Sequence, residues 1–195
     1  MNPYEKKDVK SWKRITGELV EKHPLRQHIV DLCLKSWESI LNSKINTYLN
    51  LKIKEMDISP QATGALLHDV IPEYVSKNIA GFRKGIGDEK DIVCDWNDFY
   101  SVEIKTSSQK SIYGNRSYAK SKNGKLKSGY YLAINFEKIS KQKPRIMLIR
   151  FGWLDHADWH GQKSETGQQA SLTPEAKKYK LITLYDKTND DKESP

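Results

Sequence analysis

Asp91, Glu103 and Lys105 are residue types that can hold a metal ion and direct a water molecule, and they lie close together in the sequence. Residues 100–106 alternate with period two, so Glu103 and Lys105 share one face of a predicted strand, roughly 6.6 Å apart along it. Charged side chains inside an apolar run cost free energy, and a catalytic site is one reason to keep them there. Oxygen ligands favour Mg²⁺ over zinc or copper. A lysine beside them can hold a water or offset charge on a phosphate.

A short hairpin is expected to bring Asp91 up to this strand. Residues 91–94 predict a second strand, and residues 95–98 supply the turn between the two. If the loop centres near Asn97, Asp91 lies opposite Glu103, with Cβ atoms about 5 Å apart. Two carboxylates that close repel each other unless a cation lies between them. The alternative is a surface hairpin whose Asp, Glu and Lys form a solvated ion pair without chemistry. A pattern as short as this one often occurs by chance in protein sequences.

The charge of the chain is concentrated after this hairpin. Of its 195 residues, 33 are Lys or Arg and 25 are Asp or Glu, a net charge of +8. Residues 106–145 contain ten Lys or Arg and one acid, Glu137, so that segment carries +9 and the rest of the chain carries −1. A basic footprint of this kind suits DNA or RNA, although lysine-rich loops can also serve solubility alone.

The apolar runs and the cysteines of the sequence exclude two classes of protein, membrane-spanning proteins and disulfide-rich proteins. No apolar run approaches the roughly 18 residues of a membrane span, and the N-terminus lacks the apolar core of a signal peptide. Cys33 and Cys94 form no close pair and are expected to be buried thiols in a reducing compartment. We therefore expect a cytoplasmic protein of prokaryotic type with no membrane partner.

Helical periodicity dominates the first third of the chain. Apolar spacing predicts a helix over residues 12–20 and a longer one over 24–50, which is also a candidate dimer interface. Ser59-Pro60 predicts another helix start, which Pro72 should interrupt before a second short helix ends near Gly81.

Strands follow. Strands are predicted at residues 130–136, 145–153 (a buried one) and 180–185, with a short helix from Thr173 and polar loops at 107–129 and 155–171. The fold class is therefore α/β (α+β), with a mixed central sheet flanked by helices and an N-terminal helical region.

Four segments give the chain a resemblance to a known superfamily. They are residues 63–68 (TGALLH), 87–93 (GDEKDIV), 103–107 (EIKTS) and 114–118 (GNRSY). With the hairpin, they resemble the PD-(D/E)xK nucleases, and among these the type II restriction endonucleases of the ScaI-like family. One departure is that Lys90, and no proline, precedes Asp91.

This resemblance implies Mg²⁺-dependent cleavage of double-stranded DNA. Asp91 and Glu103 would bind the metal together with the carbonyl of Ile104, and Lys105 would orient or help deprotonate the attacking water. An extra acid from the preceding helix, Asp69 or Glu73, is a further candidate. Residues 1–186 would form one nuclease domain, mainly helical over 1–57 and catalytic over 58–186, with 187–195 a disordered tail. A palindromic site would call for a homodimer.

DNA contacts are expected after the catalytic strand. Arg can read guanine and Asn or Gln can read adenine, while lysines meet phosphates. The predicted contacts are Gln109, Lys110, Tyr113, Asn115, Arg116, Tyr118, Lys120, Lys122, Lys125 and Lys127. A second recognition candidate is the loop carrying Gln162, Lys163, Gln168 and Gln169.

Alternatives remain at this point. A repair nuclease or junction resolvase would share the metal site, and a nucleic-acid-binding regulator would have no chemistry. Asp88 is a rival to Asp91. His156 and His160 have zinc-like spacing but no obvious third ligand. His68 is expected to be a core or near-core histidine.

Overall fold

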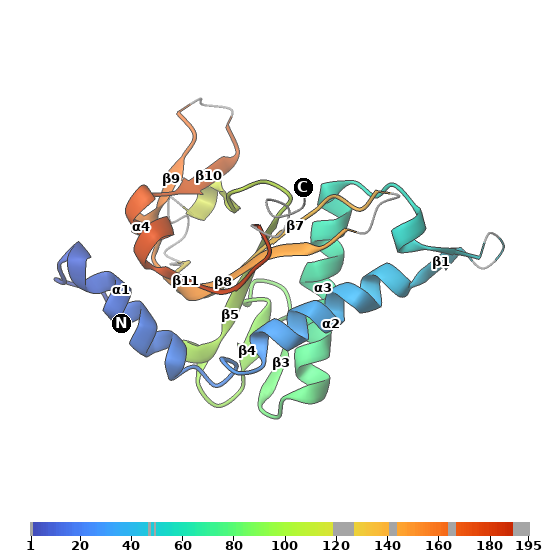
Figure 1. Ribbon diagram of the computed structural model, residues 1–195. Coiled ribbons are helices and arrows are strands. Elements are labelled where there is room, and N and C mark those ends of the chain that lie inside the picture. The colour runs from blue at the N-terminus through green and yellow to red at the C-terminus, as the bar shows by residue number, and fades with distance from the viewer. Residues whose placement is uncertain are drawn as a thin grey trace.

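A six-stranded mixed sheet is the centre of the computed structural model, which describes residues 2–46, 48, 50–118, 127–140, 144–163 and 167–188 (Figure 1). Its strand order is β11–β8–β7–β5–β4–β3. Strands β5 and β7 pair in parallel, and the other neighbours in this sheet are antiparallel. The strands are β3 (Phe82–Lys84), β4 (Ile92–Cys94), β5 (Val102–Ser107), β7 (Gly129–Phe136), β8 (Ile146–Leu154) and β11 (Leu181–Asp186). The predicted fold class is therefore confirmed.

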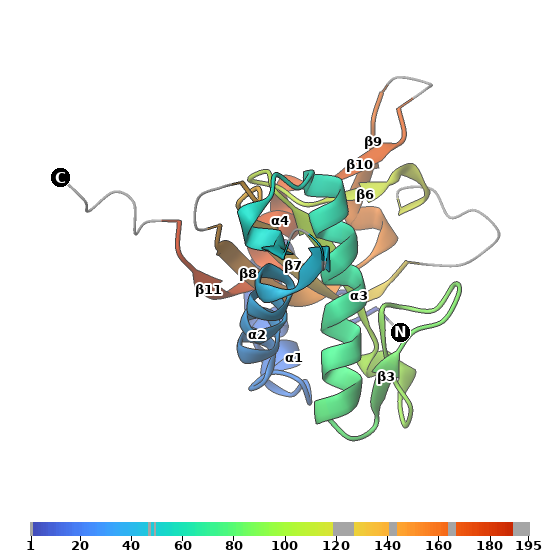
Figure 2. The same cartoon turned by 90° about the vertical axis from the view of Figure 1, so that its right-hand side faces the viewer.

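Different elements cover the two faces of the sheet. Helices α1 (Val9–Glu21), α2 (Ile29–Asn42) and α3 (Pro60–Asn78) contribute to the larger apolar core on one face. On the other face a smaller core lies under a second sheet, ordered β6–β10–β9, and the short helix α4 (Pro174–Tyr179). Strands β6 (Tyr113–Asn115), β9 (Trp159–Gly161) and β10 (Gln169–Leu172) form that sheet, and β9 and β10 lie near the top of the molecule in both views (Figures 1 and 2).

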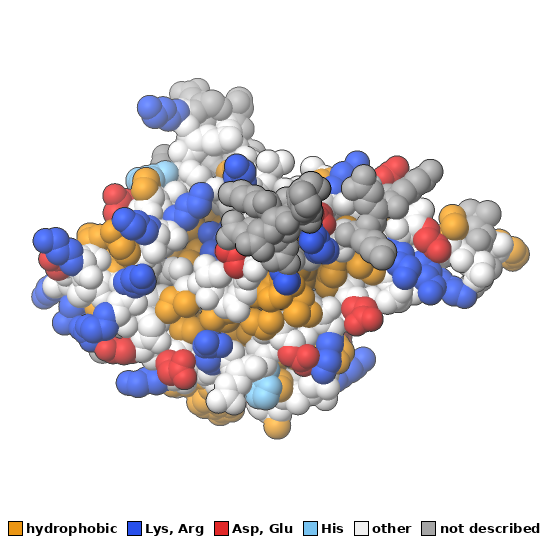
Figure 3. Space-filling model, viewed as in Figure 1, with side chains coloured by type: hydrophobic (Ala, Val, Ile, Leu, Met, Phe, Trp, Pro, Cys, Tyr) orange, Lys and Arg blue, Asp and Glu red, His pale blue; other side chains and the backbone are white. Residues whose placement is uncertain are grey.

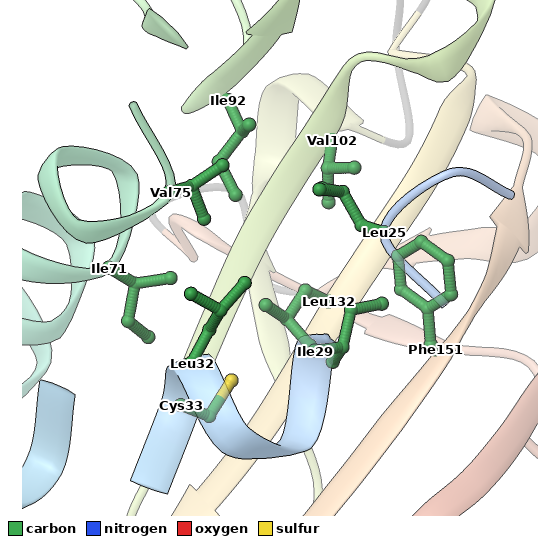
Figure 4. A pocket seen from close by; sticks show the side chains of 10 residues that line it. All are labelled: Leu25, Ile29, Leu32, Cys33, Ile71, Val75, Ile92, Val102, Leu132 and Phe151. Atoms are coloured by element: carbon green, nitrogen blue, oxygen red, sulfur yellow. The ribbon is translucent and has the colours of Figure 1, made fainter. Parts of the chain in front are cut away.

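The larger core is closely packed where α2 and α3 meet the sheet. Ten apolar side chains converge there around a cavity of only about 10 Å³ (Figure 4). Nine of them come from both helices and from β4, β5, β7 and β8, as Ile71, Ile92, Val102 and Leu132 illustrate, and Leu25 lies just before α2. A space this small and apolar marks a packed core and offers no ligand site.

Helix α3 begins as predicted but runs further. The Ser59 hydroxyl accepts a hydrogen bond from the N–H of Ala62, and Pro60 is the first helical residue. The prediction that Pro72 interrupts the helix is wrong. Pro72 has no N–H to donate, yet Ile71, Pro72 and Val75 are buried against the larger core, and this packing holds the helix together through the proline.

The predicted helix over residues 24–50 is too long. Helix α2 covers only Ile29–Asn42, because the side chains of Asn42 and Ser43 bond to the carbonyls of Glu38 and Ser39 and Ser43 turns extended. The chain then forms a hairpin of β1 (Lys44–Asn46) and β2 (Leu51–Lys52). Residues 1–57, expected to be mainly helical, thus contain this hairpin as well as α1 and α2.

Short strands account for the other differences. Strand β3 lies between Gly81 and Gly85, where no strand was predicted, and the predicted polar loop over residues 155–171 contains β9 and most of β10. Strand β6 lies in the polar stretch 107–129. Buried Trp159 and Ala170 anchor the second sheet to the smaller core, a tertiary effect that local alternation does not reveal.

The described surface shows no segregation of charge on the face seen in Figure 3. Lys and Arg side chains lie across its whole width, from the α1 end to the β1 end, with acidic side chains among them. Lys141 and Lys143, part of the predicted basic segment, and residues 189–195 of the predicted tail lie outside the described residues. Among the described helices, none is long and apolar enough to cross a membrane.

Candidate active site

The hairpin has the register expected from the sequence. Ile92 of β4 pairs with Val102 of β5, and these two residues are equally far from Asn97 in the chain. Asp91 precedes β4, and its Oδ2 accepts a hydrogen bond of 2.6 Å from the N–H of Ile104. The carboxylate therefore lies against the centre of the Glu-x-Lys triplet.

Glu103 and Lys105 lie on the face of β5 opposite Val102 and Ile104. Val102 and Ile104 are buried in the larger core, whereas Glu103 pairs across the sheet with Tyr131, a member of the smaller core. The Nζ of Lys105 lies 2.8 Å from Oε1 of Glu103 and donates to the carbonyl of Ile104 at 3.0 Å. Their side chains are only 12% and 13% exposed, so this ion pair is largely shielded from water.

Tyr118 is the residue that most closely accompanies this pair. It is 5% exposed, its hydroxyl donates to Oε1 of Glu103, and Nζ of Lys105 lies 4.8 Å from the centre of its ring. Among the described residues, no donor bonds to Oε2 of Glu103, so that oxygen remains open to a cation. In this structure Tyr118 offers DNA little surface, and its contacts order the two charged side chains.

Helix α3 presents a histidine to Asp91. The Nδ1 of His68 lies 3.2 Å from Oδ1 of Asp91, and the His68 side chain is 31% exposed, so it lies near the core and not inside it. Close approach of the helix depends on Gly64, where an added Cβ would lie only 2.8 Å from Oγ1 of Thr106 on β5. A polar residue on a helix that packs against β5 is the signal that could have identified His68.

The electrostatics of Asp91 favour its charged form. Burial opposes ionisation, but hydrogen bonds from His68 and from the N–H of Ile104, with the charge of Lys105, lower the pKa of Asp91 below its ordinary value. A carboxylate that is ionised and held from both oxygens is preorganised for a cation.

Asp69 and Glu73, the possible extra acids, have other neighbours. Asp69 bonds to Nζ of Lys84 at 2.9 Å, and Glu73 lies 3.9 Å from the same nitrogen. Both acidic side chains are more than half exposed. The α3 side chain next to Asp91 is therefore His68.

Two hollows flank the site. The larger, about 660 Å³, extends from α3 to β10, and His68, Thr106, Gln109 and Gln169 are among its lining residues. The other, about 320 Å³, is lined by Glu103 and includes Asp88, Lys90, Asp98 and Lys127. Burial lowers the pKa of Lys90. This lysine directly precedes Asp91, at the position of the proline in the PD-(D/E)xK motif.

The two predicted recognition segments lie side by side. Asn115 of β6 is directly opposite Gln169 of β10, and both are exposed. Tyr113, 40% exposed, lines the larger hollow with Gln109.

The remaining predicted DNA contacts are placed less uniformly. Lys110 is exposed, Lys127 lies 5.6 Å from the centre of the Tyr118 ring, and Arg116 begins a 3-10 helix after β6. Lys120, Lys122 and Lys125 lie outside the described residues. In the other predicted loop, Gln162 and Lys163 are exposed.

The acidic residues beside His156 and His160, the alternative zinc-site candidates, have structural roles. Asp155 and Asp158 cap the 3-10 helix that carries His156. Asp158 forms a buried ion pair with Lys180 at 2.8 Å. Within the described ranges, no group of three or more His, Cys, Asp or Glu side chains is placed to hold a metal.

The donor set at the hairpin suits a hard cation. It combines two carboxylates, Asp91 and Glu103, with the main-chain carbonyl of Ile104, which are all oxygen ligands. With so few protein ligands, waters and substrate oxygens would complete the shell, as is usual for Mg²⁺.

The chain resembles known proteins over almost its whole length. The family model described as ScaI restriction endonuclease matches residues 2–185. The chain belongs to the ScaI restriction endonuclease family. The type II restriction enzyme ScaI of Streptomyces caespitosus is 40% identical over 193 residues, which cover 94% of this chain and 85% of that enzyme. No solved structure matches the chain.

Proposed function

We propose that this chain is a type II restriction endonuclease that cleaves phosphodiester bonds of double-stranded DNA at a specific sequence with Mg²⁺. The observation that carries the proposal is the bond between Asp91 and the N–H of Ile104, which joins the acid to the Glu-x-Lys triplet. Membership of the ScaI family supports the same reaction and substrate.

The residues divide the chemistry among them. Asp91, Glu103 and the carbonyl of Ile104 would hold Mg²⁺, which when bound would offset negative charge on the phosphate and on the leaving oxygen. Lys105, in its ion pair with Glu103, would hold and orient the attacking water, whose proton would pass to surrounding water. The water oxygen bonds to phosphorus as the P–O3′ bond breaks. Tyr118 keeps Glu103 and Lys105 in position.

Sequence reading would come from side chains around the larger hollow. Gln109, Tyr113, Asn115 and Gln169 offer amide and aromatic groups that can reach base edges, and Arg116 follows Asn115. Lys110 and Lys127, with the lysines at 120, 122 and 125, would meet phosphates. We propose that a homodimer acts, since a two-fold protein axis matches a palindromic site.

One digestion separates this function from its alternatives. Purified protein is incubated with bacteriophage DNA and Mg²⁺, in the reducing conditions expected of the cytoplasm. Discrete bands are expected. Nicking that depends on DNA structure would instead indicate a repair nuclease or resolvase, and binding without cleavage would indicate a regulator. Sedimentation of the protein alone and with DNA tests the homodimer.

A further inference from the structure

A buried arginine without an acidic partner lies on the same sheet as the catalytic lysine. Arg150 of β8 is only 6% exposed. Its Nη2 donates to Oδ1 of Asn135 at 2.8 Å, and its Nε is buried with no hydrogen-bond partner. Within the described part of the chain, no Asp or Glu forms an ion pair with it. A buried cation in this state is costly unless something negative joins it.

A small pocket lies beside this guanidinium, between the two sheets. It has a volume of about 90 Å³, several times what one water needs, and its lining contains no Asp or Glu. Its polar lining side chains are those of Arg150, Lys177 of α4, Ser111, Ser171 and Tyr113. The Nζ of Lys177 already donates to Oγ of Ser111 at 2.6 Å, so a second cation is held at the pocket.

The pocket is in register with the active site. Ala133 of β7 pairs with Lys105 of β5 on one side and with Arg150 of β8 on the other. Paired residues direct their side chains to the same face, so Arg150 and Lys105 share a face with Cα atoms roughly 10 Å apart. Asn135 also links Arg150 to the chain after β5, since its Nδ2 donates to the carbonyl of Gln109.

We propose that Arg150, Lys177, Ser111 and Ser171 form a binding site for a phosphate-type oxyanion. Two cations and two hydroxyls around a space without acids are the groups that recognise such an anion. The anion could be a phosphate of the bound DNA or free inorganic phosphate. The existence of the site does not depend on DNA cleavage.

Thermal unfolding of the full chain in phosphate tests the site. The midpoint is compared in sodium phosphate and in sodium chloride at equal pH and ionic strength. For the wild type we expect phosphate to raise it by about 3–6 °C once its concentration exceeds the dissociation constant tenfold. Arg150→Met and Lys177→Ala should lose this rise, whereas Lys178→Ala, one residue further along α4 and outside the pocket lining, should keep it.

Lys177 is exposed, so Lys177→Ala keeps the test decisive even if Arg150→Met does not fold. An equal response to phosphate and chloride, or the same phosphate-specific rise in Lys177→Ala as in the wild type, would overturn the proposal. The source of the anion is found from the salt dependence of duplex binding in EDTA. A slope of log binding constant against log salt concentration that is smaller in magnitude by about 1 in Lys177→Ala identifies a DNA phosphate. An unchanged slope, with the phosphate-specific rise lost, identifies the free anion.

Discussion

The carboxylate of Asp91, just before β4, accepts a 2.6 Å hydrogen bond from the N–H of Ile104 in β5. His68 holds the other oxygen of the same carboxylate at 3.2 Å. These two contacts fix the acid relative to Glu103 and Lys105 before any metal or DNA is present. A site fixed in this way loses less freedom when it binds its ligands.

Asp91→Asn should remove metal-dependent cleavage while keeping the fold. The amide oxygen of Asn can still accept from Ile104, but it carries no charge for Mg²⁺. We expect a loss of cleavage rate of at least about a hundredfold, and weaker Mg²⁺ binding by calorimetry. Asp95→Asn is the matched control, because Asp95 is exposed and pairs with Arg83. An unchanged Mg²⁺ affinity in Asp91→Asn would exclude Asp91 as a ligand.

His68→Ala should raise the Mg²⁺ concentration needed for half-maximal cleavage by about 10–100-fold, because residues that orient metal ligands have effects of this size. Asp69→Asn, one residue along α3, should leave that requirement near the wild-type value, since Asp69 pairs with Lys84. The measurement is cleavage rate against Mg²⁺ at saturating DNA. A raised Mg²⁺ requirement in Asp69→Asn, with a wild-type requirement in His68→Ala, would mean that α3 supplies Asp69 as an extra acid.

Tyr118→Phe tests whether the tyrosine orders the site through its hydroxyl. The ring, packed 5.3 Å from that of Trp159, remains, but the bond to Glu103 is lost. We expect a cleavage rate about tenfold lower with a change in unfolding free energy of only about 1 kcal/mol. Tyr185→Phe, away from the site, serves as the control. A wild-type cleavage rate in Tyr118→Phe would show that the Tyr118 hydroxyl does not order the site.

Local patterns predicted the register of the hairpin that carries Asp91, Glu103 and Lys105, because its determinants lie within a few residues of each other. Period-two alternation placed Glu103 and Lys105 on one face, and the turn near Asn97 set the register with β4. The partners of this hairpin come from distant segments. His68 reaches Asp91 because Gly64 lets α3 approach β5, and Tyr118 is buried by packing against Trp159. Neither contact has a local signature.

Buried His23 should make stability depend on pH. Its Nδ1 accepts from the N–H of Leu25 and its Nε2 faces the carbonyl of Tyr100, an arrangement that fits the neutral ring. Burial lowers the pKa of His23 from its ordinary 6.5 to about 4. As pH falls from 6.5 toward 4, the unfolded chain takes up this proton and the folded chain does not, so the free energy of unfolding decreases.

The part of this fall in unfolding free energy that is due to His23 should reach at most about 3 kcal/mol. Urea unfolding at pH 7 and pH 4.5 measures it by comparing the wild type with His23→Leu, which should show a smaller fall. His28→Gln, at an exposed histidine, should fall as much as the wild type. Equal falls in all three proteins would mean that His23 does not carry the effect.

Cleavage by Lys105→Ala tests the central claim most directly. The wild type and the variant are compared on the same DNA, for cleavage with Mg²⁺ and for binding in EDTA, with Lys178→Ala as the exposed-lysine control. We expect Lys105→Ala to lose at least about a hundredfold in cleavage rate and to bind the DNA nearly as tightly as the wild type. Cleavage at the wild-type rate, or loss of binding with no separate effect on the rate, would contradict a catalytic role for the Asp91, Glu103 and Lys105 hairpin.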